Sequence, residues 1–213
     1  MKIQIISLFN DPAKRYLSTS MMRKATDIGV VEFEYIDLRD FGLGPRKQVD
    51  DTPYGGGDGM LLMVEPLHKA IMHAKSKDPQ ALVYLTTPKG KKLDQNMSKS
   101  IAKEANGMII VCGRYEGEDA RVMKYVDQPF SIGDFILTGG ELPALVLVDS
   151  VVRLLPGVLG GETSAEEESF SDGDNLEHPH YTRPEVYDDQ QVPDVLLSGN
   201  HAEIAKWRKE KSS

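Results

Sequence analysis

Short apolar runs alternate with longer helix-like stretches from the start of the chain to about residue 160. Runs such as Met108–Cys112 are rich in β-branched residues, whereas the stretches between them carry apolar residues at helical spacing. Strands that alternate with helices pair in parallel and are covered by helices on both faces. This alternation constrains the fold most strongly, and it predicts an α/β protein with a parallel sheet between two helical layers.

The pattern assigns each element to a stretch of sequence. The expected strands are Ile3–Phe9, Val31–Ile36, Leu82–Thr86, Met108–Cys112 and Ile132–Leu137. The expected helices are Asp11–Thr26, Val64–Lys75, one that begins near Asp94, Glu118–Tyr125 and Gly140–Leu155. A glycine-dense loop is expected between Asp50 and Met60.

The character of the sequence changes after Pro156-Gly157. The following stretch is polar, acidic and rich in glycine, serine and proline, which is typical of a linker. Further on, Asn200 stands three residues before Glu203, the spacing of a helix-capping box. We therefore predict an α/β domain over residues 1–160, a flexible acidic linker over 161–190 and a short helical tail over 191–213.

Several classes of protein are excluded by composition. A single cysteine, Cys112, cannot form a disulfide framework, and no cysteine–histidine cluster has zinc spacing. No apolar run approaches the roughly 20 residues that cross a bilayer. The apolar start of the chain lacks a signal-peptide cleavage site and is better explained by a buried strand. We expect a soluble, reduced, cytoplasmic protein that binds no membrane.

The net charge of −8 is concentrated in one segment. Between Glu162 and Asp194, eleven carboxylates accompany a single base, Arg183, so the rest of the chain is close to neutral. A polyanionic partner could bind that remainder, away from the acidic segment. Charge alone therefore does not decide the function.

Three glycine-containing loops are predicted to follow strands: Thr86–Gly90, Gly113–Gly117 and Ser131–Gly140. Each could be only a tight turn, but ligands of parallel α/β sheets bind at the carboxyl ends of strands, so three such loops favour a shared pocket. The usual nucleotide motifs and the serine-hydrolase elbow are missing. His178-Pro179-His180 lacks further ligands nearby and is better explained as a surface loop than as a metal site.

Seven segments, in order along nearly the whole chain, resemble one family. They are VDDTPYGGG (Val49–Gly57), CGRYEG (Cys112–Gly117), SIGD (Ser131–Asp134), GGELPA (Gly139–Ala144), PGVLG (Pro156–Gly160), PHYTRP (Pro179–Pro184) and LSGNH (Leu197–His201). The family is that of the bacterial tRNA (guanine-N1)-methyltransferases, the TrmD family of the SPOUT superfamily. These enzymes methylate N1 of the guanosine 3′-adjacent to the anticodon, position 37.

The resemblance implies a SPOUT-type knotted parallel sheet with helices on both faces, a small C-terminal helical domain and an obligate homodimer. It also implies that S-adenosylmethionine binds in the knot, on the three loops already noted. The matching positions are Leu85, Thr86, Thr87, Pro88, Gly113, Arg114, Tyr115, Glu116, Gly117, Ser131, Ile132, Gly133, Asp134, Phe135, Ile136, Leu137, Gly139, Gly140 and Pro143.

Methylation at N1 requires removal of a proton from guanine, after which negative charge builds on O6. The resemblance implies that Arg153 stabilises the charge on O6. From the sequence alone, Arg153 would be an ordinary charged residue at a helix end. The family generally carries an aspartate as the base where this chain has Glu168. We hypothesise that Glu168 is the base. Glu166 or Glu167 could replace it through a register shift, and a solvated charge run would explain all three equally well without the resemblance.

The partner implied by the resemblance is tRNA, with no role for DNA. The expected RNA-binding residues are Arg114, Tyr115, His180, Arg183, His201, Lys206, Arg208, Lys209 and Lys211, since cations hold phosphates and aromatic rings stack on bases. Relatives usually continue into further helices beyond this tail, so it is expected to be incomplete relative to the family. Magnesium is a possible second cofactor, with Glu116 as one weak ligand and no metal site assigned.

Two other functions remain open at this point. A SPOUT methyltransferase of another RNA, for example one acting on a ribose hydroxyl, would not need the same linker carboxylate. An inactive RNA-binding relative would bind cofactor or tRNA without turnover. Identification of the methylated nucleoside separates these alternatives.

Overall fold

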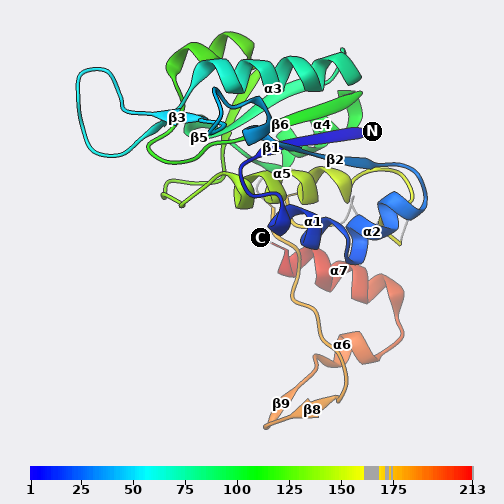
Figure 1. Cartoon of the computed structure of the whole chain (residues 1–213). Coiled ribbons are helices and arrows are strands. Elements are labelled where there is room, and N and C mark those ends of the chain that lie inside the picture. Colours follow the sequence, from blue (N-terminus) through cyan, green and yellow to red (C-terminus); the bar gives the residue numbers. More distant parts are fainter. Residues whose placement is uncertain (161–167, 171–172, 174, 213) are drawn as a thin grey trace. The chain divides into compact units, whose positions relative to one another are not determined.

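The chain divides into two compact units, Met1–Leu159 and Gly160–Ser213. The computed structural model describes residues 1–160, 168–170, 173 and 175–212. Figure 1 shows the chain coloured from its N-terminus to its C-terminus. Among the described residues, no helix is long and apolar enough to cross a membrane.

The first unit is built on a five-stranded sheet in which every pairing is parallel. The strands lie in the order β2 (Glu32–Asp37), β1 (Lys2–Ser7), β6 (Gly107–Cys112), β5 (Leu82–Lys92) and β7 (Gln128–Ser131). Ile3 of β1 pairs with Phe33 on one side and Met108 on the other, which fixes the register. The predicted α/β class and parallel sheet are confirmed.

Helices cover both faces of this sheet (Figure 1). Successive residues of the central strand β6 face opposite sides, so that Ile110 packs into one apolar core and Ile109 into the other. One core includes α1 (Asp11–Leu17), α2 (Ser20–Asp27), α4 (Gln95–Glu104) and α5 (Glu141–Val152). The other includes α3 (Val64–Lys77) and the 3-10 helices η1 (Leu38–Phe41) and η2 (Ala120–Tyr125).

The single helix expected over Asp11–Thr26 is wrong, because the chain forms two helices with a break at Ser18 and Thr19. The hydroxyls of these two residues donate hydrogen bonds to the carbonyl oxygens of Arg15 and Tyr16 at 2.9 and 2.7 Å. Such bonds compete with the helical ladder, and Thr19 adopts an extended backbone that starts α2 afresh.

The strand expected over Ile132–Leu137 is also wrong, since β7 ends at Ser131 and a loop follows it. The Ser131 hydroxyl donates to the carbonyl oxygen of Gly133 at 3.0 Å and accepts from its N–H at 3.2 Å. Gly133 has a positive φ of 154°. This local turn removes the following residues from the sheet and leaves their apolar side chains to form a loop wall.

Other expected boundaries shift without changing the architecture. β5 continues past Thr86 to Lys92, with a break in its pairing to β7 between Thr86 and Lys91. The segment expected as a helix over Glu118–Tyr125 is the shorter η2. The glycine-dense loop is closed at its base by the antiparallel pair β3 (Asp50–Asp51) and β4 (Leu61–Leu62).

The second unit contains a small hairpin and two helices. The hairpin joins β8 (Val186–Tyr187) to β9 (Gln190–Gln191) through Asp188 and Asp189, both with positive φ as a two-residue turn requires. α6 (Asp194–Leu197) and α7 (His201–Lys211) follow. The predicted cap of the last helix is confirmed, because the Asn200 side chain accepts the N–H of Glu203 at 3.4 Å.

Candidate active site

A cavity of about 480 Å³ lies where β6, β5 and β7 end. These three strands are neighbours in the sheet, so their following loops meet at one edge. The cavity is lined by Leu61, Thr86, Thr87, Pro88, Lys89, Gly113, Arg114, Tyr115, Glu116, Gly117, Glu118, Ala120, Phe130, Ser131, Ile132, Gly133, Phe135, Ile136, Leu137, Thr138, Gly139, Gly140 and Pro143. Its size and mixed lining are those of a small-molecule site.

The first wall comes from the bulge in β5. The chain leaves the regular pairing after Thr86 and rejoins it at Lys91, so the residues between them arch away from β7. Gly90 allows this return, since a Cβ atom there would lie 2.3 Å from the backbone nitrogen of Phe130. The bulge thereby places Pro88 and Lys89 at the cavity.

The second wall is a tight turn after β6. Tyr115 and Gly117 both have positive φ, and the N–H of Gly117 donates to the carbonyl oxygen of Arg114 at 3.1 Å. The N–H of Glu116 donates to Met60 at the end of the glycine-dense loop, at 3.1 Å. The turn therefore exposes the Tyr115 side chain and brings Leu61 to the cavity.

The third wall is the loop between β7 and α5. Its last residue, Gly140, donates its N–H to the carbonyl oxygen of Gly113 at 2.8 Å, and Gly139 forms an isolated antiparallel bridge with Arg114. The loop carries Phe135, Ile136 and Leu137, large apolar side chains that are all exposed. It supplies the cavity with an apolar surface beside polar backbone groups.

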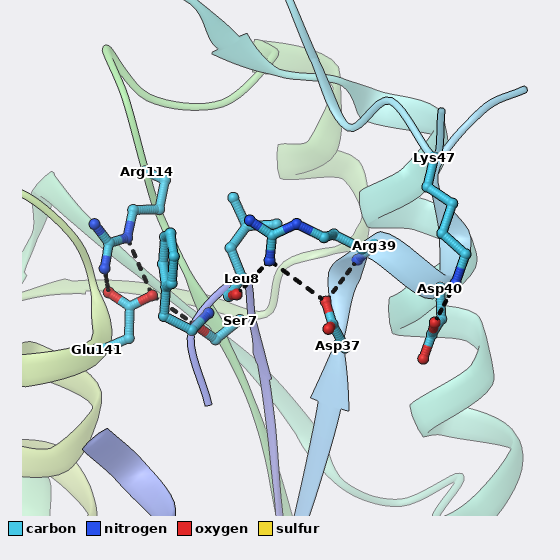
Figure 2. Close-up of polar contacts among 9 residues, drawn as sticks. Ser7, Leu8, Asp37, Arg39, Asp40, Lys47, Arg114 and Glu141 are labelled. Carbon is cyan, nitrogen blue, oxygen red and sulfur yellow. Dashed lines mark hydrogen bonds and ion pairs between the residues drawn. The ribbon is translucent and has the colours of Figure 1, made fainter. Parts of the chain in front are cut away.

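Charged groups around the cavity are few. Lys89 and Glu118 both line it, and burial raises the pKa of the Glu118 carboxyl above its usual range. Arg114 is held by Glu141, with Nη2 2.8 Å from Oε2 and Nε donating to Oε1 at 3.1 Å (Figure 2). The lining therefore combines the exposed Lys89 and Glu116, the half-buried Glu118 and the paired Arg114.

The structure brings together every residue expected to bind the cofactor except two. Leu85 is fully buried in the core beneath the cavity, and Asp134 is exposed and paired with Lys92. The additional lining residues are Leu61, Lys89, Glu118, Ala120, Phe130 and Thr138. No local sequence pattern predicts that Leu61 lines the cavity, because its position depends on hydrogen bonds between Leu62 and the distant Gly117 loop.

The two residues expected to carry the chemistry do not line this cavity. Arg153 is the half-buried C-cap of α5, whereas the cavity touches the first turn of that helix at Gly140 and Pro143. Glu168 belongs to the second unit, where it is half-buried, and two residues further on the Phe170 N–H donates to Asn175 O at 2.8 Å. The alternative bases Glu166 and Glu167 lie outside the described residues.

The expected RNA-binding residues fall on both units. Tyr115 is half exposed beside the cavity, and Arg114 is mostly enclosed by its pairing. In the second unit, His180 lies 3.1 Å from a Glu177 oxygen, and Arg183 and His201 are exposed. The remaining cations, Lys206, Arg208, Lys209 and Lys211, are exposed on α7.

Aromatic rings gather beside these cations within the second unit. His178 lies edge-on to Trp207 at 6.1 Å and 4.5 Å from His180, and Tyr181 lies 6.3 Å from Trp207. Among the described residues, no group of three or more acidic, histidine or cysteine side chains could hold a metal ion. His178 and His180 therefore belong to an aromatic cluster.

Comparisons with known proteins agree along the whole chain. The family model described as tRNA (Guanine-1)-methyltransferase TrmD matches residues 1–213. A tRNA (guanine-N(1)-)-methyltransferase of Pseudoalteromonas translucida is 52% identical over 209 residues, covering 97% of this chain and 81% of the relative. A protein of the same name from Geobacter sulfurreducens is 50% identical over 213 residues, covering 100% of this chain and 86% of the relative.

A solved structure extends the agreement to three dimensions. The crystal structure of tRNA (m1G37) methyltransferase from Aquifex aeolicus superposes with a TM-score of 0.81 at 39% identity, covering 97% of this chain and 87% of the other. Sequence and fold thus agree from end to end, and the chain belongs to the tRNA (guanine-1)-methyltransferase family.

Proposed function

We propose that this chain transfers a methyl group from S-adenosylmethionine to N1 of the guanosine 3′-adjacent to the anticodon, position 37, of tRNA. Family membership supports the reaction, and the names of its relatives supply the nucleoside and the class of RNA. The observation that carries the proposal is the cavity enclosed by three glycine-containing loops at the ends of neighbouring strands. Because tRNA is the substrate, we place the activity in the cytoplasm.

The lining of the cavity fits such a methyl donor. Ile132, Ile136 and Leu137 offer an apolar surface for an adenine ring, and the turns beside them present backbone amides and carbonyls. The donor also carries a cationic sulfonium and ammonium group and a carboxylate, which Glu118 and Lys89 complement. When bound, S-adenosylmethionine supplies an electrophilic methyl group.

The residues assigned to guanine have the required chemistry. Neutral guanine holds a proton on N1, so the Glu168 carboxylate would accept this proton as N1 bonds to the methyl carbon. The bond from that carbon to the sulfonium sulfur would break, and S-adenosylhomocysteine would leave. The charge that develops on O6 is met by the Arg153 guanidinium, which stays protonated and offers several N–H donors. Glutamate has the carboxyl chemistry of the family's aspartate on a stem longer by one methylene.

The position of Arg153 favours a site shared between two copies of the chain. The cavity touches the start of α5 and Arg153 caps its end, and a helix of 12 residues is about 18 Å long. Arg153 of the same copy thus lies at the other end of α5 from the cavity, and we propose that a second copy supplies this guanidinium. The exposed Leu142 and Val146, one turn apart on α5, provide an apolar face for this homodimer.

The route of the chain around the cavity supports the knotted SPOUT topology that we propose for the first unit. Gly140 passes so close to Thr86 and Gly113 that no side chain fits, as expected where one segment is threaded against another.

For tRNA, we propose a surface on the second unit, where His180, Arg183, His201 and the cations of α7 accompany the aromatic cluster. Among the described residues, Glu116 is not part of any group of three or more acidic, histidine or cysteine side chains that could hold a metal ion, and no step is assigned to magnesium.

The proposal is tested with labelled S-adenosylmethionine and an unmodified tRNA transcript with guanosine at position 37. Label is expected in 1-methylguanosine only, and a transcript with adenosine at that position should accept none. Methylation of another nucleoside would identify a methyltransferase of a different specificity. Donor or tRNA binding without any turnover would identify an inactive relative, and either outcome contradicts the proposal.

The base is tested separately with Glu168→Gln and its neighbour Glu167→Gln as the matched control. Loss of general-base catalysis is expected to lower kcat of Glu168→Gln by roughly a hundredfold or more, with little change in donor affinity. Glu167→Gln should keep its activity. Full activity of Glu168→Gln would show that this carboxylate is not the base.

A further inference from the structure

The carboxylate of Glu141 is buried beside the cavity although no step of the reaction uses it. It belongs to the first residue of α5, and its side chain is only 5% exposed. Oε1 accepts hydrogen bonds from the Ser7 hydroxyl at 2.6 Å and from Arg114 Nε at 3.1 Å, and Oε2 lies 2.8 Å from Arg114 Nη2. Figure 2 shows these contacts converging from β1, the loop after β6, and α5.

Such a carboxylate is strongly constrained in its position. A buried charge is tolerated only where partners replace the water that it has lost, and removal of one partner leaves the other uncompensated. Here the two-pronged pairing fixes the plane of the guanidinium as well as its distance. The N-terminus of α5 adds a favourable field for the negative charge. Glu141 therefore determines where the Arg114 guanidinium lies.

Arg114 in turn contacts residues of the cavity wall and fixes their position. Its Nη1 donates to the carbonyl oxygen of Thr138 at 3.2 Å, and its Cζ lies 4.5 Å from the centre of the Phe9 ring. The next residue, Gly139, packs directly against the pair, since a Cβ atom there would lie 2.4 Å from Arg114 Nε and 2.5 Å from Glu141 Oε2. Thr138 and Gly139 both line the cavity.

We propose that Glu141 is a positioning residue for the methyl donor. Acting through Arg114, it holds Thr138–Gly140 against the Gly113–Gly117 turn and so sets the shape of the donor cavity. This inference rests on the proposed function. It also assigns the Arg114 guanidinium to the cavity wall rather than to RNA phosphates.

The first test measures the dissociation constant of S-adenosylmethionine for Glu141→Gln, which keeps the shape of the side chain and removes its charge. An amide donor then faces the guanidinium, and the donor Kd is expected to rise by about tenfold to a hundredfold. The tRNA Kd should stay within about twofold, a split that a general loss of folding would not produce. Glu34→Gln is the matched control, because Glu34 is also ion-paired, to Lys2 and Lys77, on the edge strand away from the cavity.

Two milder variants keep the test decisive if Glu141→Gln does not fold. Ser7→Ala removes one neutral hydrogen bond, and Arg114→Lys keeps the charge but loses the two-pronged geometry. Both should weaken donor binding. Since Glu141 acts through Arg114, the combination of Glu141→Gln with Arg114→Gln should be no worse than either change alone. Unchanged donor affinity in Ser7→Ala and Arg114→Lys would overturn the inference.

The salt dependence of tRNA binding provides an independent readout. A phosphate contact contributes about 0.7 to 0.9 to the slope of log Kd against log salt concentration. Arg114→Gln is expected to leave this slope unchanged, whereas a fall of that size would assign Arg114 to a phosphate and overturn the inference. Failure of the unaltered chain to bind S-adenosylmethionine would instead count against the proposed function.

Discussion

The hydroxyl oxygen of Thr86 lies 1.9 Å from the point where a Cβ atom on Gly140 would stand. The same hydroxyl accepts the N–H of Gly113 at 2.9 Å, and Gly140 donates its own N–H to the carbonyl oxygen of Gly113 at 2.8 Å. The end of β5, the turn after β6 and the start of α5 therefore meet without space for one methyl group. This contact closes the floor of the cavity between its three walls.

Gly140→Ala should accordingly abolish tight donor binding. The methyl group would meet Thr86 and, at 2.7 Å, the backbone nitrogen of Gly113, which cannot move aside as a flexible side chain could. Overpacking of this kind costs about 1–3 kcal/mol of stability, and displacement of the loops should raise the Kd of S-adenosylmethionine at least about tenfold. Calorimetric titration measures this Kd. Gly160→Ala is the matched control, because no atom of the described residues lies within 4 Å of a Cβ atom at Gly160.

Leu142→Asp should convert the proposed homodimer into monomers. Leu142 is 58% exposed on the first turn of α5, where an acidic residue is compatible with the helix dipole, so the change should leave the fold intact. A charge in an apolar interface is costly, so sedimentation should show a single-chain mass and methyl transfer should be lost. Met72→Asp, at a comparably exposed apolar position on α3, should stay dimeric and active. A dimer that persists in Leu142→Asp would exclude this face as the interface.

Glu118→Gln should stabilise the chain at neutral pH. Burial raises the pKa of this carboxyl above its usual value of 4.5, so the folded chain holds the proton more tightly than the unfolded chain does. The free energy of unfolding therefore falls as the pH rises from the usual pKa through the raised one. Glutamine is neutral throughout, so the two denaturation curves should coincide below about pH 4 and separate at pH 7, with the variant the more stable. A variant less stable at pH 7 would contradict this.

The sequence indicated the parallel sheet and its two helical layers because each depends on local patterns. Alternate residues of Met108–Cys112 face opposite cores, as expected for a continuous apolar strand covered on both faces, and Asn200 caps its helix through its own side chain. The two wrong assignments have local causes that periodicity does not detect. Ser18 and Thr19 divide one apparent helix with hydroxyl–carbonyl bonds, and Ser131 ends a strand by bonding to Gly133.

The candidate site was predictable in its loops but not in its closure. Glycines after strands marked the three walls, whereas Leu61 reaches the cavity through contacts between distant parts of the chain. Glu141 pairs with Arg114, which lies 27 positions earlier in the chain, and with Ser7, which lies 134 positions earlier. No local pattern encodes such contacts. The glycine-containing loops after strands predicted the pocket, whereas the roles proposed for Arg153 and Glu168 come from the resemblance to the family.

Hydrogen–deuterium exchange with and without S-adenosylmethionine tests most directly whether the three loops form the donor site. Added donor should slow exchange in residues 86–90, 113–118 and 131–140 and leave the sheet edge around Met1, Leu17 and Phe33 unchanged, although a wider hollow of about 840 Å³ lies there. Protection confined to that edge, or its absence from all three loops at saturating donor, would contradict the account.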